Sequence, residues 1–82
     1  MHAGLDLSSH RPAVYLLLQD GTTVAATTAP PDLDGLRGLV GSVARTYGKN
    51  NEVLAVIESI NGARFVHDTL DLYGWSVEIA DA

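Results

Sequence analysis

A continuous apolar run with a helical pattern on each side most restricts the folds open to this chain. The run is Val53–Ile57, and its lack of alternation is typical of a central parallel strand buried on both faces. The preceding helical pattern starts near Asp32 or Asp34, either of which can cap it, and ends at about Tyr47. The following one covers about Ala63–Tyr73. Strands that alternate with helices in this way form parallel βαβ units.

Both helical segments have apolar residues at steps of three and four, which predicts one buried stripe on each. On the first segment the stripe contains Leu33, Leu36, Leu39, Val40, Val43, Ala44 and Tyr47. On the second it contains Phe65, Val66, Thr69, Leu70 and Tyr73. Gly48 and Gly74 follow the last helical residues and supply the C-terminal stops.

The remaining strand signals lie at the two ends of the chain. Ala3–Leu7 reads as a first strand, and Ala13–Gln19 and Thr22–Thr28 read as a hairpin. Between these two, Asp20-Gly21 is a strong signal for a two-residue hairpin turn. Apolar and polar residues alternate over Trp75–Ile79, which predicts a last strand.

The resulting order, β-β-β-α-β-α-β, predicts one α/β domain with a mixed five-stranded sheet and two helices. A chain of 82 residues is long enough for one small domain and too short for two. Right-handed crossovers place the fourth strand beside the first and the fifth outside it. The predicted strand order is therefore 3-2-1-4-5 with strand 2 antiparallel, which is the ribonuclease H-like arrangement.

Two of the predicted strands end in a carboxylate. Asp6 closes the first strand, and Glu58 follows Val53–Ile57. In the predicted order both lie at the carboxyl ends of neighbouring parallel strands, about 5 Å apart in the pairing direction, at the edge where open α/β sheets bind ligands. Carboxylates placed in this way suit the divalent cations used in phosphodiester chemistry. Asp6 and Glu58 are therefore the candidate catalytic and metal-binding residues, with Mg²⁺ or Mn²⁺ as the expected ion.

The residues alone leave simpler readings open. Asp6 can be a strand-end residue that accepts a hydrogen bond from the Ser8 or Ser9 amide. Glu58 can be a solvated residue near the second helix.

Three stretches, in their order and spacing, resemble the N-terminal domain of DEDD-type insertion-sequence transposases, the relatives of the Piv DNA invertase. They are Gly4–Ser8, Glu58-Ser59 followed by Gly62 and a helix, and Gly74–Ala82. The likeness covers essentially the whole chain. Ile60-Asn61, before Gly62, departs from the shorter Thr-Gly or Ser-Gly step of many relatives, and this affects where the second helix begins.

The resemblance implies a ribonuclease H-like catalytic core similar to that of Holliday-junction resolvases, with four acids that bind Mg²⁺. Asp6 matches the first acid and Glu58 the second. The other two would lie on a helix beyond Ala82, and a C-terminal domain with a serine nucleophile further on. Residues 1–82 are then expected to be a fragment of a longer transposase, inactive alone.

The implied activity is metal-dependent DNA strand cleavage and transfer, in transposition or site-specific recombination. The implied partners are the DNA of the mobile element and its target, with a guide RNA in some members of the family. Self-association is expected too, because an edge strand that carries Trp75, Val77 and Ile79 needs a cover.

The loop after the first strand holds candidates for nucleic-acid contact. Ser8, His10 and Arg11 could touch a phosphate there, although a turn or a solvated loop is the simpler explanation of these residues. On the second helix, His67 falls on the polar face beside Asp68 and is expected to be solvent-exposed.

Composition excludes several classes of function. Ten acids against five bases give a net charge of −5, which argues against tight nucleic-acid binding through phosphate neutralisation alone. A metal-dependent nuclease stays possible, because bound cations invert the local field. The chain has no cysteine, which excludes disulfides and Cys-based zinc sites and fits a cytoplasmic location. No apolar run approaches the ~20 residues that span a bilayer, so no membrane partner is expected.

Two other functions remain open. An actin-like nucleotide-binding module shares the early strand topology, but Leu7-Ser8-Ser9 lacks the glycine that its phosphate hairpin usually has. A non-catalytic docking or oligomerisation module is the third possibility.

Overall fold

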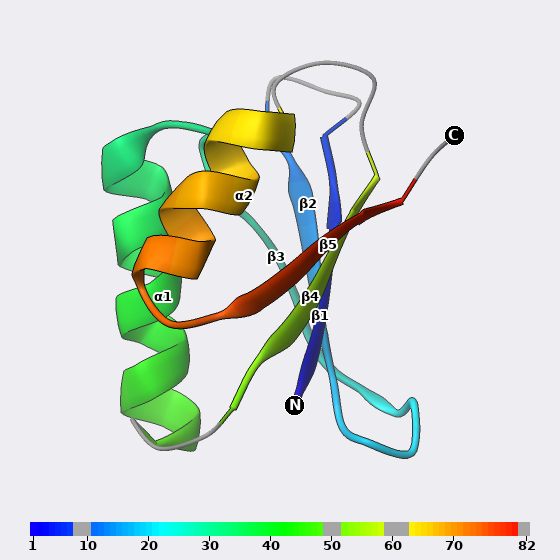
Figure 1. Cartoon of the computed structure of the whole chain (residues 1–82). Coiled ribbons are helices and arrows are strands. Elements are labelled where there is room, and N and C mark those ends of the chain that lie inside the picture. Colours follow the sequence, from blue (N-terminus) through cyan, green and yellow to red (C-terminus); the bar gives the residue numbers. More distant parts are fainter. Residues whose placement is uncertain (8–10, 49–51, 59–62, 81–82) are drawn as a thin grey trace.

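The strands and helices follow the predicted order along the chain (Figure 1). The computed structural model describes residues 1–7, 11–48, 52–58 and 63–80. The elements are β1 (His2–Asp6), β2 (Ala13–Leu17), β3 (Thr23–Thr28), α1 (Leu33–Tyr47), β4 (Leu54–Glu58), α2 (Ala63–Leu72) and β5 (Ser76–Ala80).

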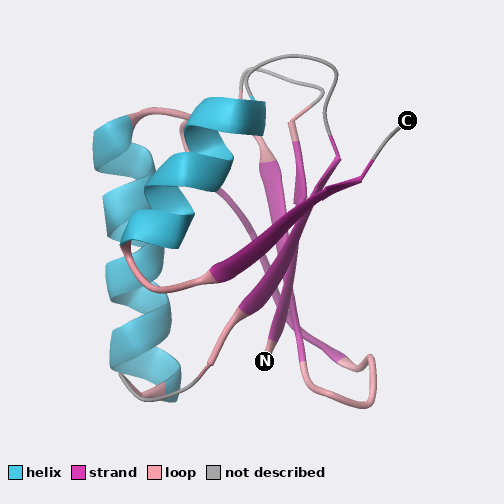
Figure 2. Cartoon of the chain, viewed as in Figure 1, coloured by secondary structure: helices cyan, strands magenta, loops and turns pink. Residues whose placement is uncertain are grey.

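The five strands form one mixed sheet in the order β3-β2-β1-β4-β5. The β1–β2 and β2–β3 pairs are antiparallel, and the β1–β4 and β4–β5 pairs are parallel. This confirms the predicted α/β class, the strand order 3-2-1-4-5 and the antiparallel strand 2. Both helices lie on the same side of the sheet, so the molecule has two layers (Figure 2).

Burial of β4 contradicts the sequence-based prediction that this strand is buried on both faces. Val53, Ala55 and Ile57 are buried, whereas Leu54 and Val56 remain 45% and 43% exposed. Successive side chains of a strand point to opposite faces, and the helices cover only one of them. The continuous apolar run therefore has one face in the core and one face uncovered.

The core lies between the helices and the covered face of the sheet. Its strand residues are Ala3, Leu5, Val14, Leu16, Ala55 and Ile57, and Ala29 and Val53 next to strands also belong to it. The helices contribute Leu36, Leu39, Val43, Val66 and Leu70, and Trp75 completes the cluster. Leu33 and Phe65 lie outside it, 54% and 48% exposed, so the predicted stripes were too wide at these positions.

The β2–β3 connection is a three-residue loop, longer than the predicted two-residue turn. The Leu18 N–H donates to the Thr22 carbonyl and the Gly21 N–H to the Leu18 carbonyl, both at 2.9 Å. Gly21 has φ 89°, the left-handed conformation that three-residue hairpin loops require at this position. The Asp20 carboxylate accepts from the Thr22 N–H at 2.8 Å. Hydrogen bonds from Thr22 lower the pKa of Asp20. The bond from the Thr22 side chain has the larger effect, and the bond from its backbone has the smaller one.

Helix α1 begins at an aspartate cap. Asp32 is extended, and its carboxylate accepts from the Gly35 N–H at 2.7 Å. Asp34 lies in the first turn, where its negative charge interacts favourably with the positive end of the helix dipole. Of the two predicted caps, Asp32 is therefore the one used.

Helix α2 ends in a turn that leads directly into the core. The Gly74 N–H donates to the Asp71 carbonyl at 3.0 Å, and the Trp75 N–H to the Leu70 carbonyl at 3.1 Å. With Gly74 at φ 96°, this is a Schellman motif, in which the residue after the glycine packs on the last helical turn. Trp75 and Leu70 are both buried. The motif that ends α2 therefore also positions the start of β5 against the core.

Two glycines of α1 should respond oppositely to alanine. A Cβ on Gly35 would collide with the Pro30 carbonyl oxygen and lie 2.8 Å from the Pro30 Cβ, whereas a Cβ on Gly38 meets nothing within 4 Å. We expect Gly35→Ala to lower the free energy of unfolding by about 1–3 kcal/mol and Gly38→Ala to raise it by about 1 kcal/mol. Chemical denaturation measures both. Equal stability of the two variants would contradict the close approach of α1 to Pro30.

The Asp20 hydrogen bonds should make the hairpin sensitive to acid. Because the pKa of Asp20 is lowered on folding, its contribution to stability is present above the unfolded-state pKa and is lost as the pH falls through the folded-state pKa. We expect Asp20→Ala to be less stable than the wild type at neutral pH, with the difference shrinking in acid. Asp20→Asn is the control, because its amide oxygen accepts the same hydrogen bond without titrating. Thermal melts across pH measure the difference, and a difference that grows in acid would disprove this account.

Candidate functional site

Asp6 and Glu58 end two strands that run side by side. In the parallel β1–β4 ladder the register pairs Gly4 with Val56 and Asp6 with Glu58. The Leu7 N–H then donates to the Glu58 carbonyl at 3.0 Å, so pairing continues one residue past the two acids. Neighbouring strands are about 4.8 Å apart, which fixes the two backbones at that spacing. The prediction that both acids lie at one edge on adjacent strands is confirmed.

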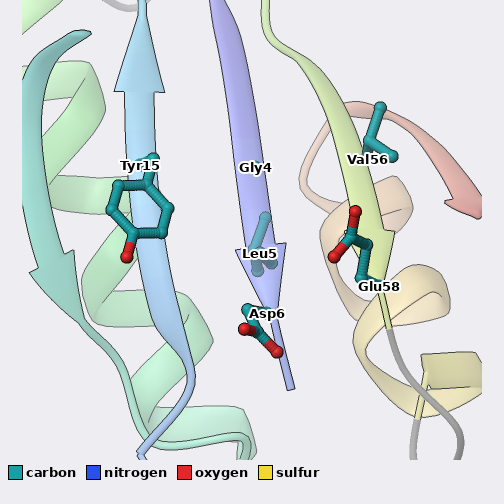
Figure 3. Close-up of a pocket in the computed structure, with 6 residues that line it drawn as sticks. All are labelled: Gly4, Leu5, Asp6, Tyr15, Val56 and Glu58. Atoms are coloured by element: carbon teal, nitrogen blue, oxygen red, sulfur yellow. The ribbon is translucent and has the colours of Figure 1, made fainter. Parts of the chain in front are cut away.

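Both acidic side chains lie on the face of the sheet opposite the helices, which we call the open face. Leu5 and Ile57, the residues before them, are buried in the core, so alternation places Asp6 and Glu58 on the other side. Both are exposed. In Figure 3 the Glu58 carboxylate is directed toward β1, at whose end Asp6 lies. Carboxylates on paired residues of adjacent strands are placed where one divalent cation can bind both.

A hollow of about 230 Å³ adjoins the two acids on the open face. Gly4, Leu5, Asp6, Tyr15, Val56 and Glu58 line it, and we call it the Gly4 hollow. Its centre is a row across three strands, in which Gly4 pairs with Tyr15 on one side and with Val56 on the other (Figure 3). A Cβ on Gly4 would meet nothing within 4 Å, so the missing side chain opens this space.

Sequence reasoning missed Gly4, Tyr15 and Val56 as parts of the site. One signal was available, because a glycine inside a strand often marks a place that a ligand approaches closely. Tyr15 and Val56 carried no such signal, since each is an ordinary strand residue whose face depends on the tertiary arrangement.

The three loop candidates have different outcomes. Ser8 and His10 lie outside the described residues. Arg11 is exposed and stands two residues before Ala13, the register partner of Asp6. It therefore lies toward the same edge of the sheet as the two acids, and its predicted contact with nucleic acid stays a prediction.

The two other polar groups that the sequence singled out lie on α2. His67 Nδ1 is 2.9 Å from Asp68 Oδ1, and the His67 side chain is 30% exposed. His67 is thus half-buried, less exposed than the sequence predicted.

Metal binding at the described residues would rest on Asp6 and Glu58 alone. Within the described ranges, no group of three or more His, Cys, Asp or Glu side chains is arranged to hold a metal ion. Mg²⁺ accepts few protein carboxylates and keeps several waters. The pair therefore fits one loosely held cation.

Comparison with protein-family models and with curated proteins gave no match to this chain. Among the described helices, none combines the length and hydrophobicity needed to cross a bilayer. The resemblance to DEDD-type transposases therefore rests on the motifs in the sequence.

Proposed function

We propose that this chain is the ribonuclease H-like N-terminal part of a DNA transposase or recombinase that cleaves and transfers DNA strands with a divalent metal ion. One observation carries the proposal. Asp6 and Glu58 are register partners at the carboxyl ends of adjacent parallel strands, and both are exposed on the face that no described helix covers. Ligand sites in open α/β sheets favour this edge.

In this proposal the two carboxylates hold the cation and orient it toward the edge of the sheet. Their oxygens are the ligand type that Mg²⁺ and Mn²⁺ prefer. A bound divalent ion supplies charge neutralisation at a phosphodiester and a more acidic water. The β1–β4 ladder fixes the spacing of the two ligands, so little reorganisation is needed when the ion arrives.

Two carboxylates form half of the site that the resemblance implies. With its third and fourth acids placed beyond Ala82, we propose that residues 1–82 bind one cation weakly and do not cleave DNA alone. The element and target DNA, a guide RNA and self-association belong to the same proposal, and all of them rest on the family resemblance.

The cation site predicts a specific pattern in a Mn²⁺ titration. We expect the wild type to bind Mn²⁺ with roughly millimolar affinity, because affinity follows the number of charged ligands. Asp6→Asn and Glu58→Gln should each weaken binding about ten-fold or more. Paramagnetic broadening of backbone amide signals measures this, and the broadening should centre on the ends of β1 and β4.

Glu78→Gln is the matched control for this titration. Glu78 is an exposed glutamate on β5 whose register partner is Val56, so it lies on the open face one row away from the acid pair. Unchanged affinity is expected in this variant. Equal Mn²⁺ affinity in all four proteins would refute the cation site. Protection by ATP without a metal requirement would support the nucleotide-binding alternative instead.

A further inference from the structure

The centre of the open face is hollow because a glycine stands where a strand residue usually has a side chain. Gly4 occupies the middle of β1, the central strand. Glycine inside a strand costs roughly 0.5–1 kcal/mol relative to alanine. A Cβ there would meet nothing within 4 Å, so no neighbouring atom forces the glycine. Its effect is to keep the Gly4 hollow open beside Asp6 and Glu58.

The walls of the Gly4 hollow are an aromatic ring on one side and an aliphatic side chain on the other. Tyr15 is 47% exposed and Val56 is 43% exposed. They flank Gly4 on β2 and β4, so their backbones are about two strand spacings, or ~9.6 Å, apart. Carbon atoms in contact lie roughly 3.5–4.0 Å apart. In Figure 3 the flat face of the Tyr15 ring is turned outward over β2, so a ring that stacks on it lies above Tyr15, at the side of the hollow.

We propose that the Gly4 hollow receives an unstacked base of a single-stranded nucleic acid, whose neighbouring phosphate lies at the cation held by Asp6 and Glu58. This inference rests on the proposed function, because the cation is what brings the phosphate to the site. The base stacks on the outward face of the Tyr15 ring and extends over Gly4. The hydroxyl of Tyr15 is directed along β2, toward the edge of the sheet at which Asp6 lies (Figure 3), where it can hydrogen-bond a base edge.

The chemistry of the lining favours a base over a charged ligand. Apart from Asp6 and Glu58, the residues that line the hollow are apolar or aromatic. Every base has a π-face that can stack on an aromatic side chain. In an intact duplex these faces are already stacked, so a single strand is the form that can enter.

The net charge of the chain distinguishes this mode of binding from phosphate neutralisation by Lys and Arg. At net charge −5, long-range attraction does not bring phosphates to this surface. Binding must come from stacking and from the bridging cation. We therefore expect single-strand binding to require Mn²⁺ and to depend on salt much less steeply than in proteins that neutralise many phosphates with Lys and Arg.

A second copy of the chain is the competing occupant of the open face. Five strands of five or six residues give this face roughly 16 by 20 Å, or about 300–400 Å² in projection. A stable interface buries about 800 Å² per partner. Two chains of net charge −5 also repel each other. An oligonucleotide is repelled by the same net charge, so the size of the face is what favours the nucleic-acid base.

The test compares an eight-nucleotide oligo(dT) with an eight-unit abasic sugar–phosphate chain, both in Mn²⁺. The two probes carry the same backbone charge and differ only in the bases. We expect the wild type to prefer oligo(dT) by about five-fold or more, because base–aromatic stacking contributes roughly that much or more per base. Tyr15→Ala should lower affinity for oligo(dT) about five- to one-hundred-fold and remove the preference. Tyr15→Phe keeps the ring and should retain most of it.

Gly4→Ala tests the hollow without removing a contact. The methyl group occupies the floor of the hollow and should weaken oligo(dT) binding. The protein should be at least as stable as the wild type, because alanine suits a strand better. Gly38→Ala, on the exposed side of α1 with open space at its Cβ, is the matched control and should bind like the wild type.

The outcomes separate this inference from the proposed function. Mn²⁺ binding in the absence of the nucleic-acid probes tests the cation site. If the wild type does not bind Mn²⁺, both the proposed function and the base site are wrong. If Mn²⁺ binds but Tyr15→Ala and Gly4→Ala bind oligo(dT) like the wild type, the base site alone is wrong. A dimer in sedimentation velocity that Tyr15→Ala dissociates, and for which oligo(dT) does not compete, would show that a second copy occupies the face.

Discussion

The parallel pairing of β1 with β4 is the interaction on which the rest of the structure depends. β1 belongs to the N-terminal meander β1–β3, and β4 follows the crossover helix α1. The β1–β4 ladder therefore joins two parts of the chain, each built from elements consecutive in sequence. Pairing of residues far apart in the chain carries a loop-closure cost, which the buried contacts of Ala3, Leu5, Ala55 and Ile57 help to offset. The same register brings Asp6 beside Glu58. A slip of β4 by one residue against β1 would turn Glu58 into the core, expose Ile57 and separate Glu58 from Asp6.

Coverage by helices on only one face gives the sheet two different surfaces. The covered face excludes water and supplies the stability of this small domain. The open face carries Tyr15, Leu54 and Val56, each more than two-fifths exposed. Parallel strands are usually covered on both sides, so this surface departs from the norm at the place where the acids and the Gly4 hollow lie. Core and candidate site therefore use alternate residues of the same strands.

The sequence predicted the elements and their order well because their signals are local. The Asp32 cap, the Gly48 and Gly74 stops, and the strand before each turn all follow from short-range chemistry, and the handedness of crossovers then settles the strand order. The adjacency of the acids followed from that order.

Burial was harder to predict, because it depends on which faces the helices cover. An apolar run such as Val53–Ile57 is compatible with one covered face or two. The Asp20-Gly21 signal placed the hairpin correctly, but the number of loop residues depends on where the ladder closes, at Leu18 and Thr22. Gly4, Tyr15 and Val56 meet only through cross-strand register, which no local pattern reports.

Three features of the open face each work against the stability of the sheet. Carboxylates on directly paired residues repel each other, at a cost of about 0.2–1 kcal/mol in a cross-strand pair. A glycine in the central strand gives up packing and adds entropy to the unfolded chain. An aromatic ring left half in water keeps apolar surface exposed that a sheet usually covers. Local departures from the rules of stability are expected at functional sites. Asp6, Glu58, Gly4 and Tyr15 share one hollow, and this coincidence is what supports the proposal that a ligand binds there.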